Sequence, residues 1–197
     1  MSTARSLSVT VDEYLTCEEA EASRNEFLDG WVAPMTGGSP RHADIISNLL
    51  FHLRTKLRER DCKVVANDMR LWVESAKLFT YPDIMVTCGD RTYFESAGTM
   101  SLTNPVLIAE VLSKATRNYD KGDKFTFYRS IPSVMDYLTI EQDCVGVERH
   151  YKSLDGKWHL EEFAAQNGDD VIGGCDLKVS MIYDGIRELE ASGSLTL

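Results

Sequence analysis

Apolar residues recur at helical spacing between residues 45 and 57, and this is the clearest periodic pattern in the chain. The positions that carry it are Ile45, Ile46, Leu49, Leu50, Leu53 and Leu57. Spacings of three and four residues place them on one face of a helix. Ser39-Pro40 precedes the pattern, with a serine suited to the N-cap and a proline whose missing N–H costs nothing in the first turn. The pattern therefore predicts a helix that begins at this dipeptide.

Other segments have the length and composition of strands. Residues 106–112 form a near-continuous apolar run, which is typical of a central strand covered on both faces. Shorter segments rich in β-branched residues precede it, and three further segments follow it as a meander with a turn at Asp155-Gly156. The predicted shorter strands span residues 63–66, 68–73, 84–88, 134–140, 145–151 and 158–163.

Two more helices and a hairpin complete the predicted elements. A short acidic helix is expected at residues 11–21, and a second amphipathic helix at residues 118–129. Residues 26–35 are extended and turn at Asp29-Gly30, a dipeptide that favours a tight hairpin. Helices and strands in this order predict an α+β (mixed α/β) fold around one sheet.

The size and composition of the chain suit one soluble domain. It has 197 residues, of which 43% are hydrophobic and 26% are charged, so it can bury one sizeable core and is not expected to be disordered. We expect a single domain over residues 1–197, with its core at residues 11–185 and a frayed end from residue 191. No apolar stretch is long enough to span a bilayer, and residues 1–20 lack the layout of a secretory signal. A cytoplasmic location is therefore expected.

Five cysteines lie far apart, and none forms a C-x-x-C pair: Cys17, Cys62, Cys88, Cys144 and Cys175. Their odd number and irregular spacing argue against a disulfide scaffold and against a zinc site. We expect reduced thiols that mostly act as small buried hydrophobic side chains. Cys88 and Cys144 fit this interpretation best, because apolar β-type residues flank them.

The charge of the chain argues against a protein that binds DNA tightly. The chain has 21 Lys and Arg against 31 Asp and Glu, and its net charge is −10. Affinity for DNA rests mainly on cations that neutralise phosphates. Two basic clusters could still provide a local basic surface, or they could be ordinary solvated helix faces. The clusters are Arg41, Arg54, Lys56, Arg58 and Arg60, and Lys114, Arg117, Lys121, Lys124 and Arg129.

Two carboxylates in strand segments indicate possible chemistry. Glu110 lies inside the apolar run, where stripping water from a carboxylate is costly unless a partner compensates it. Asp83 follows a proline at the start of another strand. Such a pair could share Mg²⁺ or Mn²⁺, which takes oxygen ligands, activates water and draws charge from a phosphoryl group. Lys121, Lys124 and Tyr128 share one helix face by their spacing, and a lysine there could stabilise developing negative charge.

The residues stand in a longer pattern that resembles the Uma-two family of restriction-type endonucleases in the PD-(D/E)XK superfamily. The segments that carry the resemblance read "YPDIMV", "PVLIAEVLSKATRNYDKGDKFTFYRS" and, upstream, "RNEFLDGWVAPM" and "PRHADIISNLLFHL". The shared positions are Pro82, Asp83, Glu110, Val111, Ser113, Thr116, Arg117, Asp120, Lys124 and Tyr128, with Glu26, Asp29, Gly30 and His42 upstream. The resemblance covers residues 11–185, which is nearly the whole chain.

The resemblance implies both a fold and an activity. The fold would be a restriction-endonuclease-like core, in which helices flank a central mixed sheet, with extra meander strands toward the C-terminus. The activity would be a Mg²⁺- or Mn²⁺-dependent endonuclease that acts on DNA as a homodimer. Asp83 and Glu110 would be its catalytic metal ligands. The superfamily's usual Glu-x-Lys has Leu112 at its third position here, so Lys124 on the helix is the candidate for the catalytic lysine.

Each of the three candidate catalytic residues also has a structural interpretation. Asp83 could simply terminate a strand, since Pro-Asp is common at turns. Glu110 could be neutral or could pair with an arginine such as Arg70 or Arg117. Lys124 could be an ordinary solvated lysine of a helix.

Four accessory residues carry further expectations, and for two of them alternatives remain open. Glu26 could be a third metal ligand or a polar residue that flanks the hairpin. His42 could contact metal or substrate, or could be a capping group at the first turn of a helix. Tyr128 is expected to pack against the sheet with its hydroxyl near the site, and Lys121 to lie at the surface.

Two hypotheses about function follow from these residues. The first is a metal-dependent endonuclease that hydrolyses DNA phosphodiester bonds. The second is a catalytically weak or inactive nuclease-fold module that binds nucleic acid or a protein partner, and the missing Glu-x-Lys and the acidic charge favour it.

Overall fold

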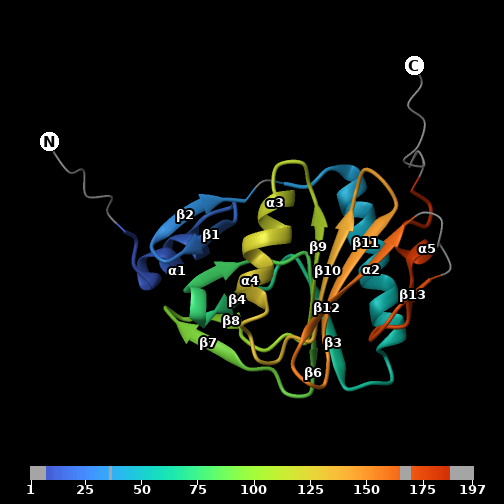
Figure 1. Cartoon of the computed structure of the whole chain (residues 1–197). Helices are drawn as coiled ribbons and strands as arrows, with labels where there is room; N and C mark the ends of the chain where they lie inside the picture. Colours follow the sequence, from blue (N-terminus) through green and yellow to red (C-terminus); the bar gives the residue numbers. More distant parts are fainter. Residues whose placement is uncertain (1–7, 36, 165–169, 187–197) are drawn as a thin grey trace, which may run out of the picture.

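The computed structural model of the chain describes residues 8–35, 37–164 and 170–186. Two six-stranded sheets form its body (Figure 1). The strands of the first, which we call the central sheet, are β3 (Cys62–Ala66), β6 (Ile84–Cys88), β9 (Leu107–Leu112), β10 (Asp136–Glu141), β11 (Gly146–Lys152) and β12 (Trp158–Ala164). Their order is β12-β11-β10-β9-β6-β3, in which β9 and β10 are parallel and the other neighbours antiparallel. The predicted α+β class, with a central mixed sheet and a C-terminal meander, is confirmed.

The second sheet contradicts the prediction of a single sheet. Its strands are β1 (Asn25–Leu28), β2 (Trp31–Pro34), β4 (Leu71–Val73), β5 (Leu78–Thr80), β7 (Tyr93–Ser96) and β8 (Thr99–Leu102). Their order is β2-β1-β5-β4-β8-β7, and a single 3₁₀ turn, η1 (Glu74–Ala76), joins β4 to β5. The strands β5, β7 and β8 have only three or four residues each, which is too short for an alternating pattern to stand out in the sequence.

The first two helices begin where the sequence predicts. The helix α1 (Val11–Ala20) opens with a capping box between Thr10 and Glu13. The helix α2 (Pro40–Lys56) starts after Ser39, whose side-chain oxygen accepts a hydrogen bond from the backbone N–H of His42. These caps satisfy backbone N–H groups that have no partner within the first turn of a helix.

The predicted second amphipathic helix is one helical segment in three parts. It runs from α3 (Arg117–Tyr119) through a π-helical turn (Asp120–Lys124) into α4 (Phe125–Tyr128). We call residues 117–128 the helical segment. The chain then forms the meander β10–β12, a short hairpin of β13 (Val171–Ile172) and β14 (Leu177–Lys178), and the one-turn helix α5 (Val179–Ile182).

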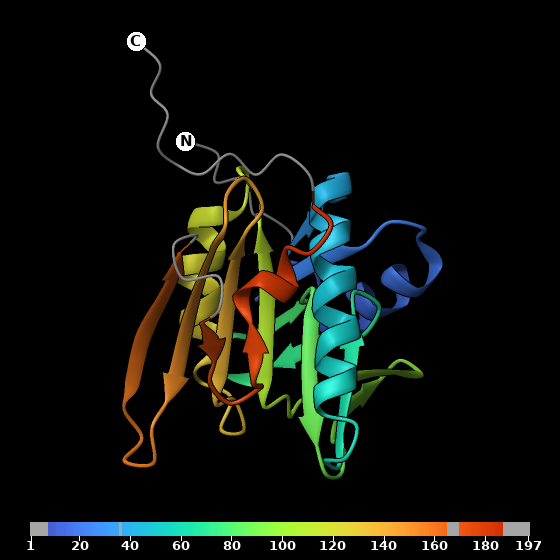
Figure 2. The ribbon, with the colours of Figure 1, turned by 90° about the vertical axis from the view of Figure 1, so that its right-hand side faces the viewer.

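The central sheet is covered on both faces. Figure 2 shows α2 and α5 side by side across one face, and Leu107, Ala109 and Val111 of β9 join the core on that side. Ile108 of β9 and Met85 of β6 face the opposite way and pack with the helical segment and the second sheet. All six residues of β9 are buried, as predicted from their near-continuous apolar run.

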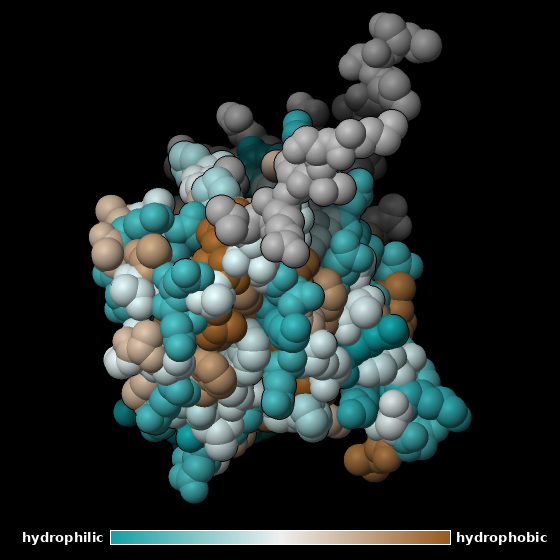
Figure 3. All heavy atoms as spheres, turned by 90° about the vertical axis from the view of Figure 1, so that its left-hand side faces the viewer, coloured by the Kyte–Doolittle hydropathy of each residue, from teal (hydrophilic) through white to brown (hydrophobic). Residues whose placement is uncertain are grey.

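The helix α1 packs on the second sheet through an aromatic cluster that contains Tyr14, Phe27 and Phe79. The strand β2 lies at the edge of this sheet, and all four of its residues are exposed. Figure 3 shows this side of the protein, where hydrophobic atoms lie in small groups among hydrophilic ones.

The prediction of five reduced thiols is wrong for two of them. Cys62 and Cys88 occupy opposite positions on β3 and β6 and form a disulfide. Strand pairing brings them together although they lie 26 residues apart in the sequence. Among the free cysteines, Cys175 is buried, Cys144 is half-buried and Cys17 is exposed.

Two other expectations concern the membrane and the C-terminus. None of the helices in the described residues is long and apolar enough to cross a membrane. The end expected to be frayed from residue 191 lies outside the described residues.

Candidate active site

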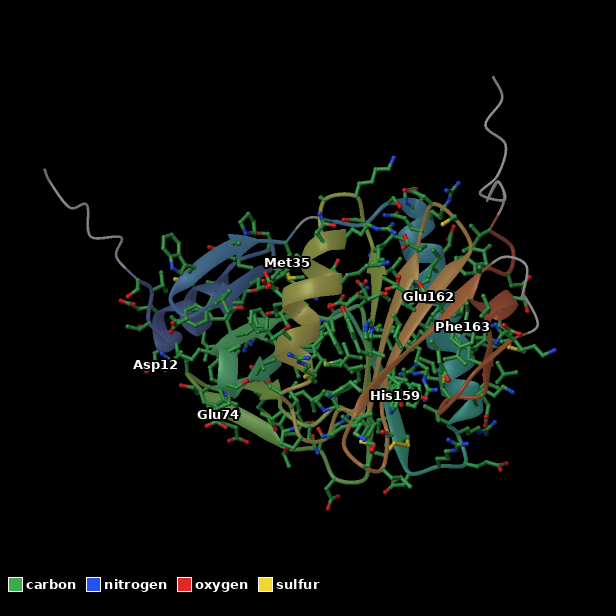
Figure 4. All side chains as sticks on the ribbon, in the orientation of Figure 1. Asp12, Met35, Glu74, His159, Glu162 and Phe163 are labelled. Atoms are coloured by element: carbon green, nitrogen blue, oxygen red, sulfur yellow. A yellow bond between two sulfur atoms is a disulfide. The ribbon has the colours of Figure 1, made fainter. Side chains whose placement is uncertain are left out.

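A cleft of about 1030 Å³ opens where the central sheet, the N-terminal end of α2 and the helical segment meet. Part of its wall comes from β2 and from Met35, which Figure 4 shows between β2 and the helical segment. The predicted site residues that line it are Glu26, His42, Asp83, Glu110 and Lys124. The structure therefore brings together five residues that lie far apart in the sequence.

Glu110 faces the helical segment because of its place on β9. Side chains alternate between the two faces of a strand, so Glu110 points to the same side as Ile108, away from α2. Its Oε1 accepts hydrogen bonds from Lys124 Nζ at 3.0 Å and from the Tyr128 hydroxyl at 2.8 Å. Burial raises the pKa of the Glu110 carboxyl to about 7, even though the charge of Lys124 opposes this rise.

The arginines considered as partners of Glu110 are engaged elsewhere. Arg70 donates to the hydroxyls of Ser101 and Thr99 within the second sheet. Arg117 forms an ion pair with Glu141 at the end of β10. The cation beside Glu110 is therefore Lys124, and only 5% of the surface of Lys124 is exposed to solvent.

Asp83 lies directly before β6 and adjoins Glu110. Its Oδ2 accepts a hydrogen bond of 2.7 Å from the backbone N–H of Val111, the residue that follows Glu110 on the neighbouring strand. Its own backbone N–H donates to Glu110 Oε2 over 3.3 Å. Repulsion from Asp83 is one of the causes that raise the pKa of Glu110. The two residues thus adjoin each other and line one cleft.

His42 approaches the same carboxylates from the first turn of α2. Its Nε2 lies 3.2 Å from Asp83 Oδ2. Burial favours the neutral ring, but the hydrogen bond and the charge of Asp83, together with the charge of Glu110, outweigh it and raise the pKa of His42. Gly38 allows this placement, because a Cβ at that residue would come within 2.4 Å of His42 Nδ1.

Lys124 is the only cation of the helical segment that lies at the cleft floor. Burial acts to lower its pKa, but attraction to Glu110 and Asp120 outweighs burial and keeps the pKa above its usual range. The side chain therefore stays charged. Lys121, placed on the same helix face by its sequence spacing, turns instead toward Glu148 and Glu141 of β11 and β10, at 2.6 and 3.3 Å.

Glu26 reaches the cleft from β1 of the second sheet. Its Oε1 accepts a hydrogen bond of 2.5 Å from the Tyr119 hydroxyl, and its Oε2 accepts one of 2.7 Å from Thr80 Oγ1. Both of its oxygens are therefore bound to hydroxyl groups of the protein. Its carboxylate ties the second sheet to the helical segment, and its role as a third metal ligand remains a prediction.

The donor chemistry at the cleft floor suits a divalent cation. Mg²⁺ typically takes one or two carboxylates and completes its shell with water and phosphate oxygens. The described residues contain no group of three or more His, Cys, Asp or Glu side chains placed to hold a metal. A Mg²⁺ site with one or two protein carboxylates does not require such a group. Asp83 and Glu110 adjoin each other, because the backbone N–H of Asp83 donates to the Glu110 carboxylate. These residues fit a cation that would offset the crowding of negative charge.

Comparison with known proteins identifies the family. The family profile of Uma2, described as "Putative restriction endonuclease", matches residues 11–179. The chain belongs to the Uma2 family. This confirms the resemblance found in the sequence.

Similar proteins extend over most of the chain. Two come from Synechocystis sp. (strain ATCC 27184 / PCC 6803 / Kazusa): the uncharacterized protein sll1609 is 37% identical and covers 86% of this chain and 95% of its own, and the uncharacterized protein slr1290 is 32% identical and covers 89% and 91%. A crystal structure of a "putative nuclease belonging to DUF820" from Anabaena variabilis ATCC 29413 has a TM-score of 0.70, 17% identity, and coverage of 89% of this chain and 97% of that one. At that identity the structural likeness supports the fold alone.

Proposed function

We propose that this Uma2 protein is a Mg²⁺- or Mn²⁺-dependent endonuclease that hydrolyses phosphodiester bonds of DNA. The observation that carries the proposal is the meeting of Asp83 and Glu110 at the floor of a cleft that also holds Lys124. The Glu110 carboxylate is buried and crowded by other carboxylates, so a divalent cation would compensate charge there.

The residues of the cleft have distinct roles in this proposal. Asp83 and Glu110 would hold the cation, which when bound supplies an activated water and stabilises negative charge on a phosphoryl group. Lys124 holds its proton and would stabilise charge that develops on a phosphate oxygen. His42 donates to Asp83 and would orient that carboxylate. Leu112 occupies the position of the usual lysine, and Lys124 supplies an ammonium group from the helical segment instead.

The acidic charge of the chain bears on how DNA would bind. Some cations of the predicted basic clusters are neutralised within the fold, because Arg117 and Lys121 form ion pairs with Glu141. Lys114 is exposed and lines the cleft mouth, where it would meet a phosphate. With so few cations at the cleft we expect weak binding that decreases with salt. Pairing of two copies, as restriction-type cores use to cut two strands, is part of this proposal and can be tested by sedimentation velocity.

Plasmid nicking tests the proposed reaction. Purified protein with Mg²⁺ or Mn²⁺ should nick supercoiled plasmid, and Asp83→Asn should lower the rate by about 100-fold or more, since several kcal/mol of charge stabilisation is lost. Asp90→Asn is the matched control, because Asp90 is an exposed aspartate after the far end of β6. A wild type that does not nick, or equal nicking by Asp83→Asn, would reject the proposal.

Calorimetric titration separates the enzyme from an inactive module of the same fold. The enzyme should bind Mn²⁺ with a heat that disappears in Asp83→Asn and persists in Asp90→Asn. A module that only binds a partner should give no heat that depends on Asp83.

A further inference from the structure

Asp120 is a buried carboxylate to which the proposed mechanism gives no role. It is the first residue of the π-helical turn, and only 3% of its surface is exposed. Its Oδ1 lies 3.0 Å from Lys124 Nζ, four residues further along the chain. Among the described residues no hydrogen bond reaches this oxygen, so its contact with Lys124 is an ion pair. A buried carboxylate needs a partner to offset its desolvation, and at Oδ1 that partner is Lys124.

The backbone fixes Asp120 in place relative to the central sheet. Its carbonyl oxygen accepts a hydrogen bond of 2.8 Å from the hydroxyl of Tyr137, a fully buried residue of β10. The π-helical turn begins at this residue and ends at Lys124. Isolated π turns within α-helices often coincide with functional sites, because they redirect side chains at a cost in helix stability. Here the turn places Asp120 and Lys124 together at the cleft floor.

The other partner of Lys124 is shared among several groups. Glu110 accepts from Lys124 and Tyr128 through one oxygen and from the backbone of Asp83 through the other. In the proposed function Glu110 also holds the cation. Asp120 has no hydrogen bond to Asp83 or Glu110 among the described residues, and its ion pair is with Lys124.

We propose that Asp120 is a positioning residue for the reaction: it holds the ammonium group of Lys124 at the cleft floor while Glu110 serves the cation. This inference rests on the proposed function, because it concerns the same site. Asp120 acts through Lys124 and does not itself touch the substrate. The chain offers a matched control in Asp123, an exposed aspartate of the same π-helical turn.

A double-mutant cycle on plasmid nicking tests the inference. Asp120→Asn keeps the shape of the side chain and removes its charge, so kcat should fall by about 10- to 100-fold with little change in KM, as for other residues that orient a catalytic group. Asp123→Asn should leave both constants unchanged. In a Lys124→Met background Asp120→Asn should cause no further loss, because the group that it positions is absent.

The outcomes distinguish this inference from the proposed function. Two results with an active wild type would overturn the role of Asp120 and leave the proposed function standing. In the first, Asp120→Asn has the same activity as Asp123→Asn. In the second, Asp120→Asn lowers activity as much in the Lys124→Met background as in the wild type. A wild type that does not nick overturns both. The kcat comparison of Asp120→Asn with Asp123→Asn needs no Lys124→Met protein, so it decides the question even if that variant does not fold. Circular dichroism verifies that each assayed variant is folded.

Discussion

The hydroxyl of Tyr128 should stabilise the protein by an amount that depends on pH. Tyr128 is fully buried and donates a hydrogen bond of 2.8 Å to Glu110 Oε1. Tyr128→Phe removes this donor and leaves the aromatic ring in place. A hydrogen bond to a charged group contributes about 1.5–3 kcal/mol to stability, and one between neutral groups about 1 kcal/mol. The cost of the substitution therefore depends on whether Glu110 carries its charge.

The sign of the pH dependence follows from the pKa of Glu110. Burial raises that pKa to about 7 in the folded protein, above the usual value of 4.5 for a free glutamate. The contribution of Glu110 to stability is therefore fully present at pH values below its pKa in the unfolded protein. It is lost as the pH rises through its pKa in the folded protein. The hydrogen bond from Tyr128 lowers the pKa of Glu110 in the folded protein. Tyr128→Phe should therefore raise this pKa, and the loss of stability should continue to a higher pH than in the wild type. The variant should be less stable than wild type by about 1 kcal/mol at low pH and by about 1.5–3 kcal/mol at high pH.

Urea unfolding at about pH 5.5 and about pH 8.5 measures both values. Groups whose pKa the substitution leaves unchanged cancel between wild type and variant. Tyr137→Phe is the matched control, since Tyr137 is equally buried and its hydroxyl donates over 2.8 Å to a neutral carbonyl, that of Asp120. Its cost should stay near 1 kcal/mol at both pH values. A cost for Tyr128→Phe that does not change with pH, or that equals that of Tyr137→Phe at high pH, would refute this account of Glu110.

Two further predictions concern the framework around the site. Replacing both Cys62 and Cys88 by serine should lower the free energy of unfolding by about 3–4 kcal/mol, because their crosslink closes a loop over a separation of 26 residues. Cys144→Ser is the control. Detection of five free thiols in the native oxidised protein would contradict the disulfide. Leu49→Ala should cost about 2–5 kcal/mol because Leu49 is fully buried on the inner face of α2. Phe51 belongs to the same helix and its side chain is 64% exposed, so Phe51→Ala should lower the free energy of unfolding by about 0.5 kcal/mol or less in the same urea titration. Equal losses for Leu49→Ala and Phe51→Ala would refute the assigned buried face of α2.

The sequence by itself determined the elements whose signals are local. Ser39-Pro40 marks the start of α2, and the repeat that includes Leu49 and Leu53 marks its buried face. The apolar run around Glu110 marks β9, the strand of the central sheet that is buried on both faces. Such signals are readable because a cap involves neighbouring residues and a buried face repeats with the period of its own element. For the same reason a charge inside the apolar run already pointed to Glu110.

Only the tertiary structure decided which distant groups meet. The second sheet, the disulfide and the partner of Glu110 depend on strand order and register, and a segment of three or four residues carries too few positions to fix either. The sequence offered Arg70 and Arg117 as partners of Glu110, and the fold supplies Lys124 instead, because the helical segment crosses the face of β9 to which Glu110 points. Asp120 stood in the family-like pattern without a role, although its spacing of four residues from Lys124 was a signal that the two could pair.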